Sequence, residues 1–523
     1  MRSATGCADR DDLSDTGAGS ADSVIVTTAR KIRQPFPAVD VPSQMKSSIE
    51  IGNARSRITG LDRETFRLLG YELSYQIGEP GVRRYLSRSG SVETSFWDGY
   101  KRLLSKSGVF PSGLIPRVLR LLGKWGIPKP ALTDLRDRPP RSDPRWEWPE
   151  GIELRDYQIA AVGSAEAAGR GVIDSPPRSG KTFMMAELIR RLSVKTVITA
   201  PTEAIAAQTH DRLKELFVGH ADDFYLLTGG PPKTRKAIIR AGRALVFSAT
   251  AATAAGMAQP WWDQIRCLIV DERHHQAAKT YQDISDLAVN AYYRFGFTGT
   301  NYRSHEGESI ALEACLGRTV ASYSISEMTE REVLVPGRVE FLPIDYRGVR
   351  SKKFDVAYRQ GIVRSDLRNA VIARTAKRYQ AEGRKVLILV HYIKHGQSLE
   401  AMIPGSQFVQ GGNTVEVRQA VSDLDSGEIC CLIGSPVVGE GLDCPAADCL
   451  LYAKGYKARV THTQDVFRVL TGGAKKNPAI IVDFADRHNP TLLDHSVDRL
   501  RNYISLGLDV SVADTLDCES ELF

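Results

Sequence analysis

The residues whose types and spacing best suit chemistry lie between Gly171 and Thr182. A short β-branched run leads into a Pro-containing turn, and Gly180-Lys181-Thr182 then opens a segment with apolar residues at helical spacing. A strand, a loop and a helix that meet at Gly-Lys-Thr can cradle nucleotide phosphates, because backbone N–H groups bind the oxygens, the lysine neutralises charge and the hydroxyl holds Mg²⁺. The predicted nucleotide contacts in this loop are Pro177, Arg178, Ser179, Gly180, Lys181 and Thr182.

The loop departs from the usual phosphate-binding pattern at two positions. Ser175 stands where the motif G-x-x-x-x-G-K-[ST] has its first glycine, and Arg178 occupies the middle of the loop. A turn that caps a helix and binds no ligand is therefore the alternative that Gly-Lys-Thr alone leaves open.

A pair of carboxylates follows Lys181 by ninety residues. The apolar run Cys267–Val270 ends in Asp271-Glu272, which suits ATP hydrolysis. We expect Asp271 to hold Mg²⁺ together with Thr182, and Glu272 to orient and deprotonate the attacking water. An acidic turn at the end of a strand is the alternative for Asp-Glu alone, but its position after a phosphate-binding loop disfavours that interpretation.

The composition is that of an ordinary globular protein with room for about three domains of ~100–200 residues. No run approaches the ~18 apolar residues of a membrane span, and the N-terminus lacks the apolar core of a signal peptide, so we expect a cytoplasmic protein. The eight cysteines show no zinc spacing and several lie in apolar runs, which favours reduced core residues.

Composition and periodicity divide the chain into six segments. We predict a disordered tail at 1–47, a basic N-terminal accessory domain that binds DNA at 48–130, a Pro-rich linker at 131–150, a first α/β domain at 151–335, a second α/β domain at 336–490, and a C-terminal helix and tail at 491–523.

Two series of short apolar runs alternate with helical patterns across the two α/β segments. Fully apolar strands separated by helices are typical of parallel sheets that are covered on both faces. The expected strands are Thr196–Ala200, Ala244–Phe247, Cys267–Val270 and Phe295–Phe297, and then Val386–Val390, Ile429–Ile433, Cys449–Tyr452 and Ala479–Val482.

Positive charge is concentrated near the N-terminus. Residues 48–145 hold 18 Lys and Arg against 10 Asp and Glu, so this segment accounts for +8 and the remainder of the +7 chain for −1. Such a domain suits a polyanionic partner, and its aromatics Phe96 and Trp97 lie among basic residues that we expect to contact nucleic acid: Arg83, Arg84, Lys101 and Arg102. A solvated basic face around a small aromatic core is the alternative.

From residue 150 to 490 the chain resembles the superfamily 2 helicases of the DExH type, closest to the XPB- and UvsW-like DNA helicases. Leu154–Gln158 is similar to the family's Leu-Arg-x-Tyr-Gln element, and Phe295–Thr300 is similar to its motif III. The resemblance implies two tandem RecA-like domains with ATP and Mg²⁺ bound between them. It also implies nucleotide contacts from Arg155, Gln158, Gly441 and Asp443, and nucleic-acid contacts from Pro201, Thr202, Thr250, Thr298 and Thr300.

The resemblance is weakest at motif VI. Where the family has Gln-x-x-Gly-Arg-x-x-Arg, this chain has Gln464, Phe467, Arg468 and Thr471. Gln464 and Arg468 keep the implied catalytic positions, but the final arginine, which is usually a finger on the γ-phosphate, is Thr471. Loss of such a finger can cost ~10³-fold or more in turnover, so weak hydrolysis is expected unless Lys475 or Lys476 reaches the site.

The sequence therefore predicts an ATP-dependent DNA helicase or translocase. We expect it to act as a monomer on branched or damaged DNA in recombination, repair or replication, with replication, recombination or nuclease partners. Arg178, Phe467 and Thr471 favour an alternative, a nucleic-acid-binding ATP switch or remodelling motor that does not separate strands, including the motor subunit of a defence or restriction complex.

Overall fold

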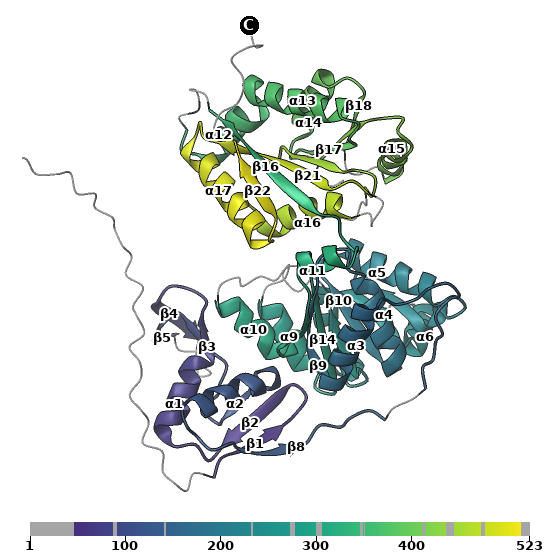
Figure 1. The fold of residues 1–523 in the computed structure, drawn as a ribbon. Helices are drawn as coiled ribbons and strands as arrows, with labels where there is room; N and C mark the ends of the chain where they lie inside the picture. The colour runs from purple at the N-terminus through teal and green to yellow at the C-terminus, as the bar shows by residue number, and fades with distance from the viewer. Residues whose placement is uncertain are drawn as a thin grey trace, which may run out of the picture.

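Three structural units follow one another along the chain (Figure 1). The computed structural model describes residues 46–86, 92–140, 143–231, 234–271, 278–299, 306–345, 349, 351–410, 414–435, 444–471 and 476–513. Among these residues, no helix has the length and apolar character needed to cross a membrane.

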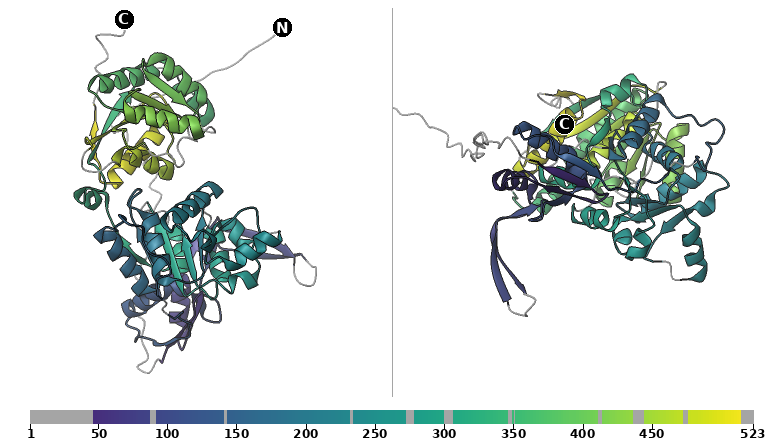
Figure 2. Two further views of the ribbon diagram at one scale, coloured as in Figure 1. Left: turned by 90° about the vertical axis from the view of Figure 1, so that its right-hand side faces the viewer. Right: turned by 90° about the horizontal axis from the view of Figure 1, so that it is seen from below.

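The N-terminal unit is a small mixed α/β domain. Its described elements are β1 (Ser48–Ile51), β2 (Arg55–Thr59), α1 (Arg63–Glu72), β3 (Ser74–Gln76), β4 (Gly81–Leu86), β5 (Val92–Trp97), β6 (Tyr100–Arg102), β7 (Val109–Pro111), α2 (Ile115–Lys124) and β8 (Ala131–Asp134). The strands form a sheet of order β7-β2-β1-β8 and two pairs, β3-β6 and β4-β5. The β4–β5 hairpin projects away from the body of the molecule in both views of Figure 2.

The middle unit is built on a parallel sheet covered by helices. Its described elements are α3 (Asp156–Ala168), β9 (Arg170–Asp174), α4 (Lys181–Leu192), β10 (Thr196–Ala200), α5 (Glu203–Leu216), β11 (Phe224–Leu227), α6 (Arg235–Arg243), β12 (Val246–Thr250), α7 (Ala251–Ala255), α8 (Gln259–Trp262), β13 (Cys267–Val270), α9 (Ala278–Leu287), β14 (Tyr293–Thr298), α10 (Glu306–Leu316), β15 (Thr319–Ser322) and α11 (Ile325–Glu330). Among the described residues, seven strands lie in the order β11-β12-β10-β13-β14-β9-β15, and every pairing is parallel.

The third unit repeats this architecture. Its described elements are β16 (Gly337–Ile344), α12 (Phe354–Tyr358), α13 (Asp366–Ala381), β17 (Val386–Leu389), α14 (Ile393–Met402), β18 (Ser406–Val409), α15 (Thr414–Ser426), β19 (Cys431–Gly434), β20 (Cys449–Tyr452), α16 (Arg459–Leu470), β21 (Ala479–Asp486), α17 (Pro490–Ser505) and β22 (Asp509–Val512). The described strands have the order β18-β19-β17-β20-β21-β16-β22, again all parallel.

The predicted fold class is confirmed: two tandem RecA-like α/β domains follow a small N-terminal α/β domain. All eight expected strands are present, and β10, β13 and β20 have the expected bounds. Every residue of these three strands is buried, because each strand has helices on both faces and neighbours on both sides.

Two segments carry more structure than their composition suggested. The Pro-rich range 131–150 begins with β8, which pairs in parallel with β1, and it includes Trp146, which is fully buried in the first RecA-like core. The prolines lie beside these structured stretches and do not interrupt them. After residue 490, α17 packs on β21, and β22 pairs with β16 at the edge of the second sheet.

The N-terminal domain docks on α9 and α10 of the first RecA-like domain (Figure 1). Arg55 pairs with Asp286 at 2.6 Å, and Arg117 pairs with Glu313 at 2.5 Å. The apolar core of the N-terminal domain continues into α10 through Ile310, Ala311 and Ala314. In the chain α9 comes after β13 and α10 comes after β14, so this domain rests on the helices that follow these two neighbouring strands.

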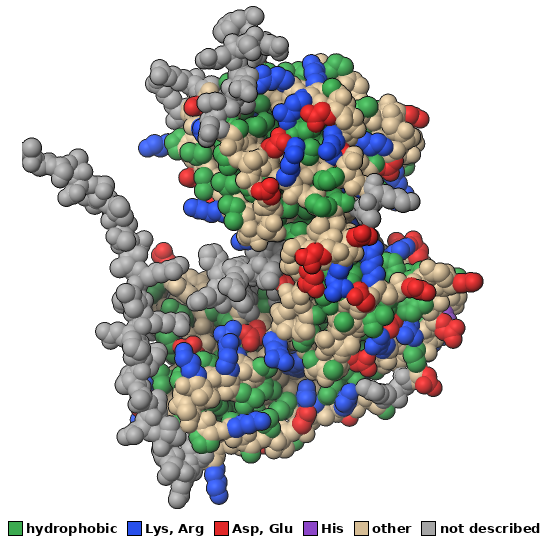
Figure 3. Space-filling view, in the orientation of Figure 1, with side chains coloured by type: hydrophobic (Ala, Val, Ile, Leu, Met, Phe, Trp, Pro, Cys, Tyr) green, Lys and Arg blue, Asp and Glu red, His purple; other side chains and the backbone are tan. Residues whose placement is uncertain are grey.

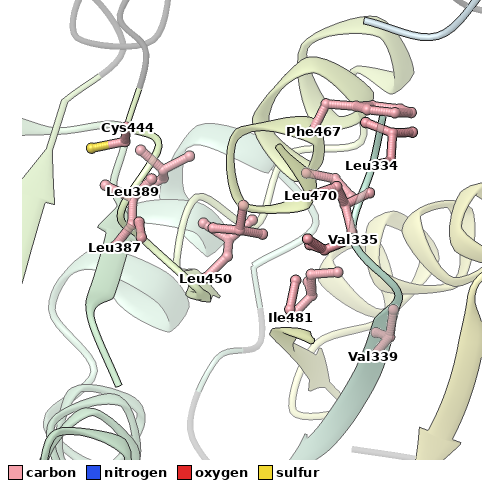
Figure 4. Packing of buried hydrophobic residues seen from close by; sticks show 14 of the residues in the cluster. Leu334, Val335, Val339, Leu387, Leu389, Cys444, Leu450, Phe467, Leu470 and Ile481 are labelled. Carbon is pink, nitrogen blue, oxygen red and sulfur yellow. The ribbon is translucent and has the colours of Figure 1, made fainter. Parts of the chain in front are cut away.

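The two RecA-like domains meet around the connector that follows α11. Val335 N donates to Leu470 O at 2.9 Å, and Leu334 forms an antiparallel bridge with Thr471. Tyr157 of α3 shares a hydrophobic cluster with this connector and with the core of the second domain. Figure 4 shows Leu334 beside Phe467 in that cluster. The connector is therefore packed against the end of α16.

Candidate functional site

The loop between β9 and α4 has a phosphate-binding geometry. Ser175 N donates to Thr298 O at 3.0 Å, which ties the start of the loop to the end of β14. The Ser179 hydroxyl donates to the Ser175 hydroxyl at 2.7 Å, and both residues are buried. This bond gives Ser175 a structural role at the position where the motif has glycine. At the other end of the loop, α4 begins at Lys181, so the N–H groups of its first turn face the loop.

Helix α3 braces the loop from behind. Tyr157 Oη donates to Ser179 O at 2.7 Å, and Gln158 Nε2 donates to the same oxygen at 3.0 Å. Gln158 Oε1 also accepts from Arg155 N at 3.0 Å. A Cβ at Gly180, which has φ of 79°, would overlap Gln158 Nε2, so this position requires glycine. The structure places Gln158 as a positioning residue for the loop, and Arg155 is exposed at the start of α3; their contacts with a nucleotide remain predictions.

Lys181 and Asp271 lie at the carboxyl edge of the first sheet. Asp271 follows β13 directly, is 8% exposed, and its N–H donates to Thr199 O at 2.9 Å. Lys181 Nζ lies 2.8 Å from the point where a Cβ on Gly299 would stand, so glycine leaves room for the ammonium group beside the end of β14. β13 and β14 are neighbours in the sheet, and β14 adjoins β9, which carries the loop. These residues fit a nucleotide with Mg²⁺. Glu272 and Thr300 lie outside the described residues.

Two of the residues predicted to contact nucleic acid, Thr202 and Thr250, lie at the carboxyl ends of the neighbouring strands β10 and β12. Thr202 follows β10 and caps α5 by accepting from Ile205 N at 3.3 Å. Thr250 ends β12 and caps α7 by accepting from Thr253 N at 3.1 Å. Pro201 lies between β10 and Thr202. The three residues therefore share one edge of the sheet, and contact with nucleic acid stays a prediction for them.

Thr298, which is also predicted to contact nucleic acid, lies beneath the phosphate-binding loop. It is fully buried, pairs with Asp174 between β14 and β9, and supports Ser175 through its carbonyl oxygen. Its burial places it under the nucleotide loop in this conformation. Thr298 thus supports the loop through its backbone, and its contact with nucleic acid stays a prediction.

Motif VI lies on α16, which packs against the second sheet. Arg468 is 7% exposed, and its Nε lies 3.4 Å from Asp465 Oδ1. Lys454 Nζ donates to the other oxygen of Asp465 at 2.7 Å. Gln464 is half-buried one turn before Arg468. Phe467 is 2% exposed in the core of the second domain, so the ring that replaces the family's glycine serves packing.

Arg178 in the phosphate-binding loop and Arg468 on α16 are positively charged residues from the two different RecA-like domains. Burial and, after it, the positive charge of Arg468 lower the pKa of Arg178 to about 10. Tyr157, whose hydroxyl donates to Ser179 O of the loop, packs in one hydrophobic cluster with Phe467 of α16. The phosphate-binding loop of the first domain therefore faces motif VI of the second.

Among the described residues at the end of motif VI, neither Thr471 nor Lys476 takes the place of the missing arginine. Thr471 Oγ1 donates to Arg468 O at 3.1 Å, so its hydroxyl turns back onto α16. Lys476 Nζ donates to Val469 O at 2.9 Å and to Thr471 O at 2.5 Å, which uses its ammonium group as a cap for the same helix. Lys475, Gly441 and Asp443 lie outside the described residues.

The basic residues of the N-terminal domain divide into different environments. Lys101 is half-buried and donates to Gln282 of α9, so it contributes to domain docking and not to an open basic surface. Arg102 is exposed and pairs with Asp98 at 2.5 Å. Phe96 is 74% exposed, against the alternative in which it is a core residue, whereas Trp97 is half-buried over Gly78. Arg83 and Arg84 lie on β4, and their side chains are outside the description.

Several supporting residues were not identified from the sequence as part of the site. Tyr157 lies within the quoted Leu154–Gln158 element, so the resemblance could have indicated it. The Ser175–Ser179 pair and the buried partners Lys454 and Asp465 had no such signal, because their roles depend on contacts that only the folded chain creates.

The fold and the position of this site define a protein with two RecA-like domains and a phosphate-binding loop at the carboxyl edge of the first sheet. Residues 151–303 match the family model described as "Type III restriction enzyme, res subunit". A protein named Rad25 from Haloarcula marismortui is 27% identical over 316 residues, which are 58% of this chain and 48% of that protein. The chain thus spans about half the length of this curated relative.

One solved structure shares this architecture, and a second is reported beside it. The type ISP restriction-modification enzyme LlaBIII has a TM-score of 0.52 and 15% identity, with 71% of this chain and 32% of that chain covered. The structure of T4 UvsW has a TM-score of 0.45 and 19% identity, with 90% and 99% covered. The resemblance predicted from the sequence is confirmed by the family match and by the Haloarcula relative.

Proposed function

We propose that the chain is an ATP-dependent DNA helicase or translocase that acts on branched or damaged DNA in recombination, repair or replication. The observation that carries the proposal is the approach of the phosphate-binding loop to motif VI at the junction of the two RecA-like domains, where Tyr157 bonds to Ser179 O of the loop and packs in one cluster with Phe467 of motif VI. Both halves of the site belong to one chain, so a monomer suffices.

Each residue of the first domain has a defined task in the proposed reaction. Lys181 binds the β and γ phosphates of ATP, and Thr182 and Asp271 hold Mg²⁺, which neutralises phosphate charge. Glu272 accepts a proton from water while the water oxygen bonds to the γ-phosphorus. The bond from that phosphorus to the β–γ bridging oxygen breaks, and ADP leaves with the electron pair.

Closure of the two domains on ATP would change the distance between loops at their edges. Thr202 and Thr250 mark such an edge in the first domain, and the connector links its movement to α16. Opening after hydrolysis would then shift one domain along a bound strand. Contacts to the backbone carry no sequence information, so a preference for DNA structure over sequence is expected.

DNA as the partner is supported by charge and by the names of the relatives. Figure 3 shows Lys and Arg side chains over the N-terminal domain with a few acidic ones among them. The Haloarcula protein carries the name of a DNA 3′–5′ helicase, and LlaBIII is described as ATP-dependent and bound to DNA.

A second candidate is a remodelling motor or ATP switch that does not separate strands, including the motor subunit of a restriction complex. Thr471 in place of the final arginine favours it, as does the match of residues 151–303 to a restriction-enzyme family. In that case ATP would drive binding or movement along duplex DNA, and a nuclease would be a partner.

Strand displacement separates the two candidates. A forked duplex with a labelled strand is incubated with the protein, ATP and Mg²⁺, and ATP hydrolysis is followed in the same sample. The helicase proposal expects both activities, and Glu272→Gln should abolish both while ATP binding remains. Hydrolysis without displacement on any forked or branched substrate would favour the second candidate.

A further inference from the structure

Arg178 adopts the left-handed backbone conformation, which is unfavourable for residues other than glycine. Among the described residues, the non-glycine residues with positive φ are Arg178 at 72°, Ser193 at 46° and Glu332 at 56°. Ser193 ends α4, and Glu332 closes the turn after α11, so both have the local reason of a helix end. Arg178 lies inside the phosphate-binding loop, where glycine would avoid the steric cost of Cβ.

Residues with strained backbone conformations are concentrated at active sites and ligand-binding sites, where the side chain contributes to function. Arg178 adjoins Ser179, whose carbonyl oxygen accepts from Tyr157, and Tyr157 packs in one hydrophobic cluster with Phe467 of α16. Arg178 therefore lies close to the junction between the two domains, and the effect of the Arg468 charge on its pKa agrees with this position. Two guanidinium groups that approach each other repel, and an anion between them removes that repulsion. The anion that the site is built to receive is the terminal phosphate held by Lys181.

At position 471 the second domain lacks the arginine that would place a guanidinium group near the γ-phosphate. In the described part of motif VI, residue 471 carries a hydroxyl bonded to Arg468 O, and Lys476 is used at the end of α16. Arg468 shares Asp465 with Lys454, so part of its charge is balanced within its own domain. A guanidinium supplied by the loop itself would compensate for Thr471.

We propose that Arg178 is a catalytic residue that binds the γ-phosphate from within the phosphate-binding loop and replaces the arginine finger absent at position 471. This inference rests on the proposed ATP hydrolysis. Charge that develops on the equatorial oxygens and on the bridging oxygen during hydrolysis is stabilised by the Arg178 guanidinium on one side and by Arg468 on the other. The proton still passes from water to Glu272.

Two substitutions separate the charge of Arg178 from its backbone strain. Arg178→Gly and Arg178→Ala both remove the guanidinium, but only glycine relieves the left-handed conformation. Without nucleotide, Arg178→Gly should raise the melting temperature by roughly 2–4 °C over Arg178→Ala. Both should bind ADP within about threefold of the wild type and bind ADP with aluminium fluoride and Mg²⁺ at least about 100-fold more weakly, because that complex mimics the transferring phosphoryl group.

A gain of function provides the decisive comparison. Thr471→Arg places a guanidinium at the usual position, and in the Arg178→Gly background it should restore analogue binding and turnover at least tenfold. Arg178→Lys should restore little, since lysine lacks the planar fork. If Arg178→Gly binds the analogue and hydrolyses ATP as the wild type does, the inference is wrong. If the wild type shows no DNA-stimulated turnover, the proposed function fails instead, and the analogue affinities still decide the role of Arg178.

Discussion

At the scale of single residues, the site combines motif positions with local substitutions that the fold accommodates. Ser175 replaces a glycine, yet its hydroxyl accepts from Ser179 inside the loop. Phe467 replaces another glycine and packs beside Leu334 (Figure 4). The positions of Lys181 and Asp271 could be predicted because each belongs to a short sequence motif: Lys181 begins the helix after the loop, and Asp271 directly follows a buried strand. The partners of Ser175 and Phe467 could not, since they depend on tertiary packing.

Lys476 gives the first prediction at this scale. Its ammonium group donates to Val469 O and Thr471 O, so it caps α16 and does not face the nucleotide. Lys476→Met should lower the free energy of unfolding by about 1–2 kcal/mol, because two hydrogen bonds to carbonyl oxygens at the end of α16 are lost, while ATP turnover at saturation changes less than about twofold. Urea unfolding and steady-state hydrolysis measure the two effects. A large loss of turnover with unchanged stability would contradict this role.

The same lysine predicts a dependence on pH. Burial lowers the pKa of Lys476 to about 8, below its ordinary value near 10.4 in the unfolded chain. Between pH 8 and about 10.4 the unfolded state therefore binds more protons than the folded state, so this residue makes the free energy of unfolding rise with pH in that window. The stability difference between wild type and Lys476→Met should grow from pH 8 to pH 10. A difference that stays constant or shrinks over this range would exclude the expected linkage.

At the scale of elements, the buried central strands could be predicted from the sequence, whereas the exposed strands at the edges of the sheets could not. β10, β13 and β20 are apolar throughout because neighbours and helices enclose them. β22 (Asp509–Val512) is largely exposed at the edge of the second sheet, and β8 (Ala131–Asp134) is exposed along its length, so neither has an apolar run to reveal it. The docking of the N-terminal domain on α9 and α10 is likewise a tertiary contact without a local pattern.

A pair of glycine substitutions tests that docking. A Cβ at Gly113 would overlap Glu313 O and lie 2.6 Å from Ala314 O of α10, whereas a Cβ at Gly123 on α2 would meet no atom within 4 Å. Gly113→Ala should destabilise the protein by about 2 kcal/mol or more through overpacking, and Gly123→Ala should stabilise it by about 0.5–1 kcal/mol through helix propensity. Chemical denaturation measures both. Equal effects of the two variants would show that the contact with α10 is not tight.

At the scale of the whole molecule, the basic charge of the N-terminal domain can be tested without removing the domain. A truncation would uncover Ile310, Ala311 and Ala314 of α10, so loss of charge and loss of stability would be mixed. Arg120 and Lys124 are exposed on α2, and the double variant Arg120→Glu, Lys124→Glu keeps the docking surface. Its DNA affinity should fall, and the slope of log K against log salt should decrease by up to about 2, since fewer counterions are released. An unchanged slope would assign this surface another task.

The central claim is that ATP hydrolysis at the junction of the two RecA-like domains is driven by DNA. The most direct measurement is the rate of ATP hydrolysis by the full chain with Mg²⁺, with and without forked DNA, beside Lys181→Ala as the matched control. The account predicts turnover that rises at least tenfold with DNA and disappears in Lys181→Ala, because the loop then lacks the lysine that binds the β and γ phosphates. Turnover that ignores DNA, or that persists in Lys181→Ala, would contradict it.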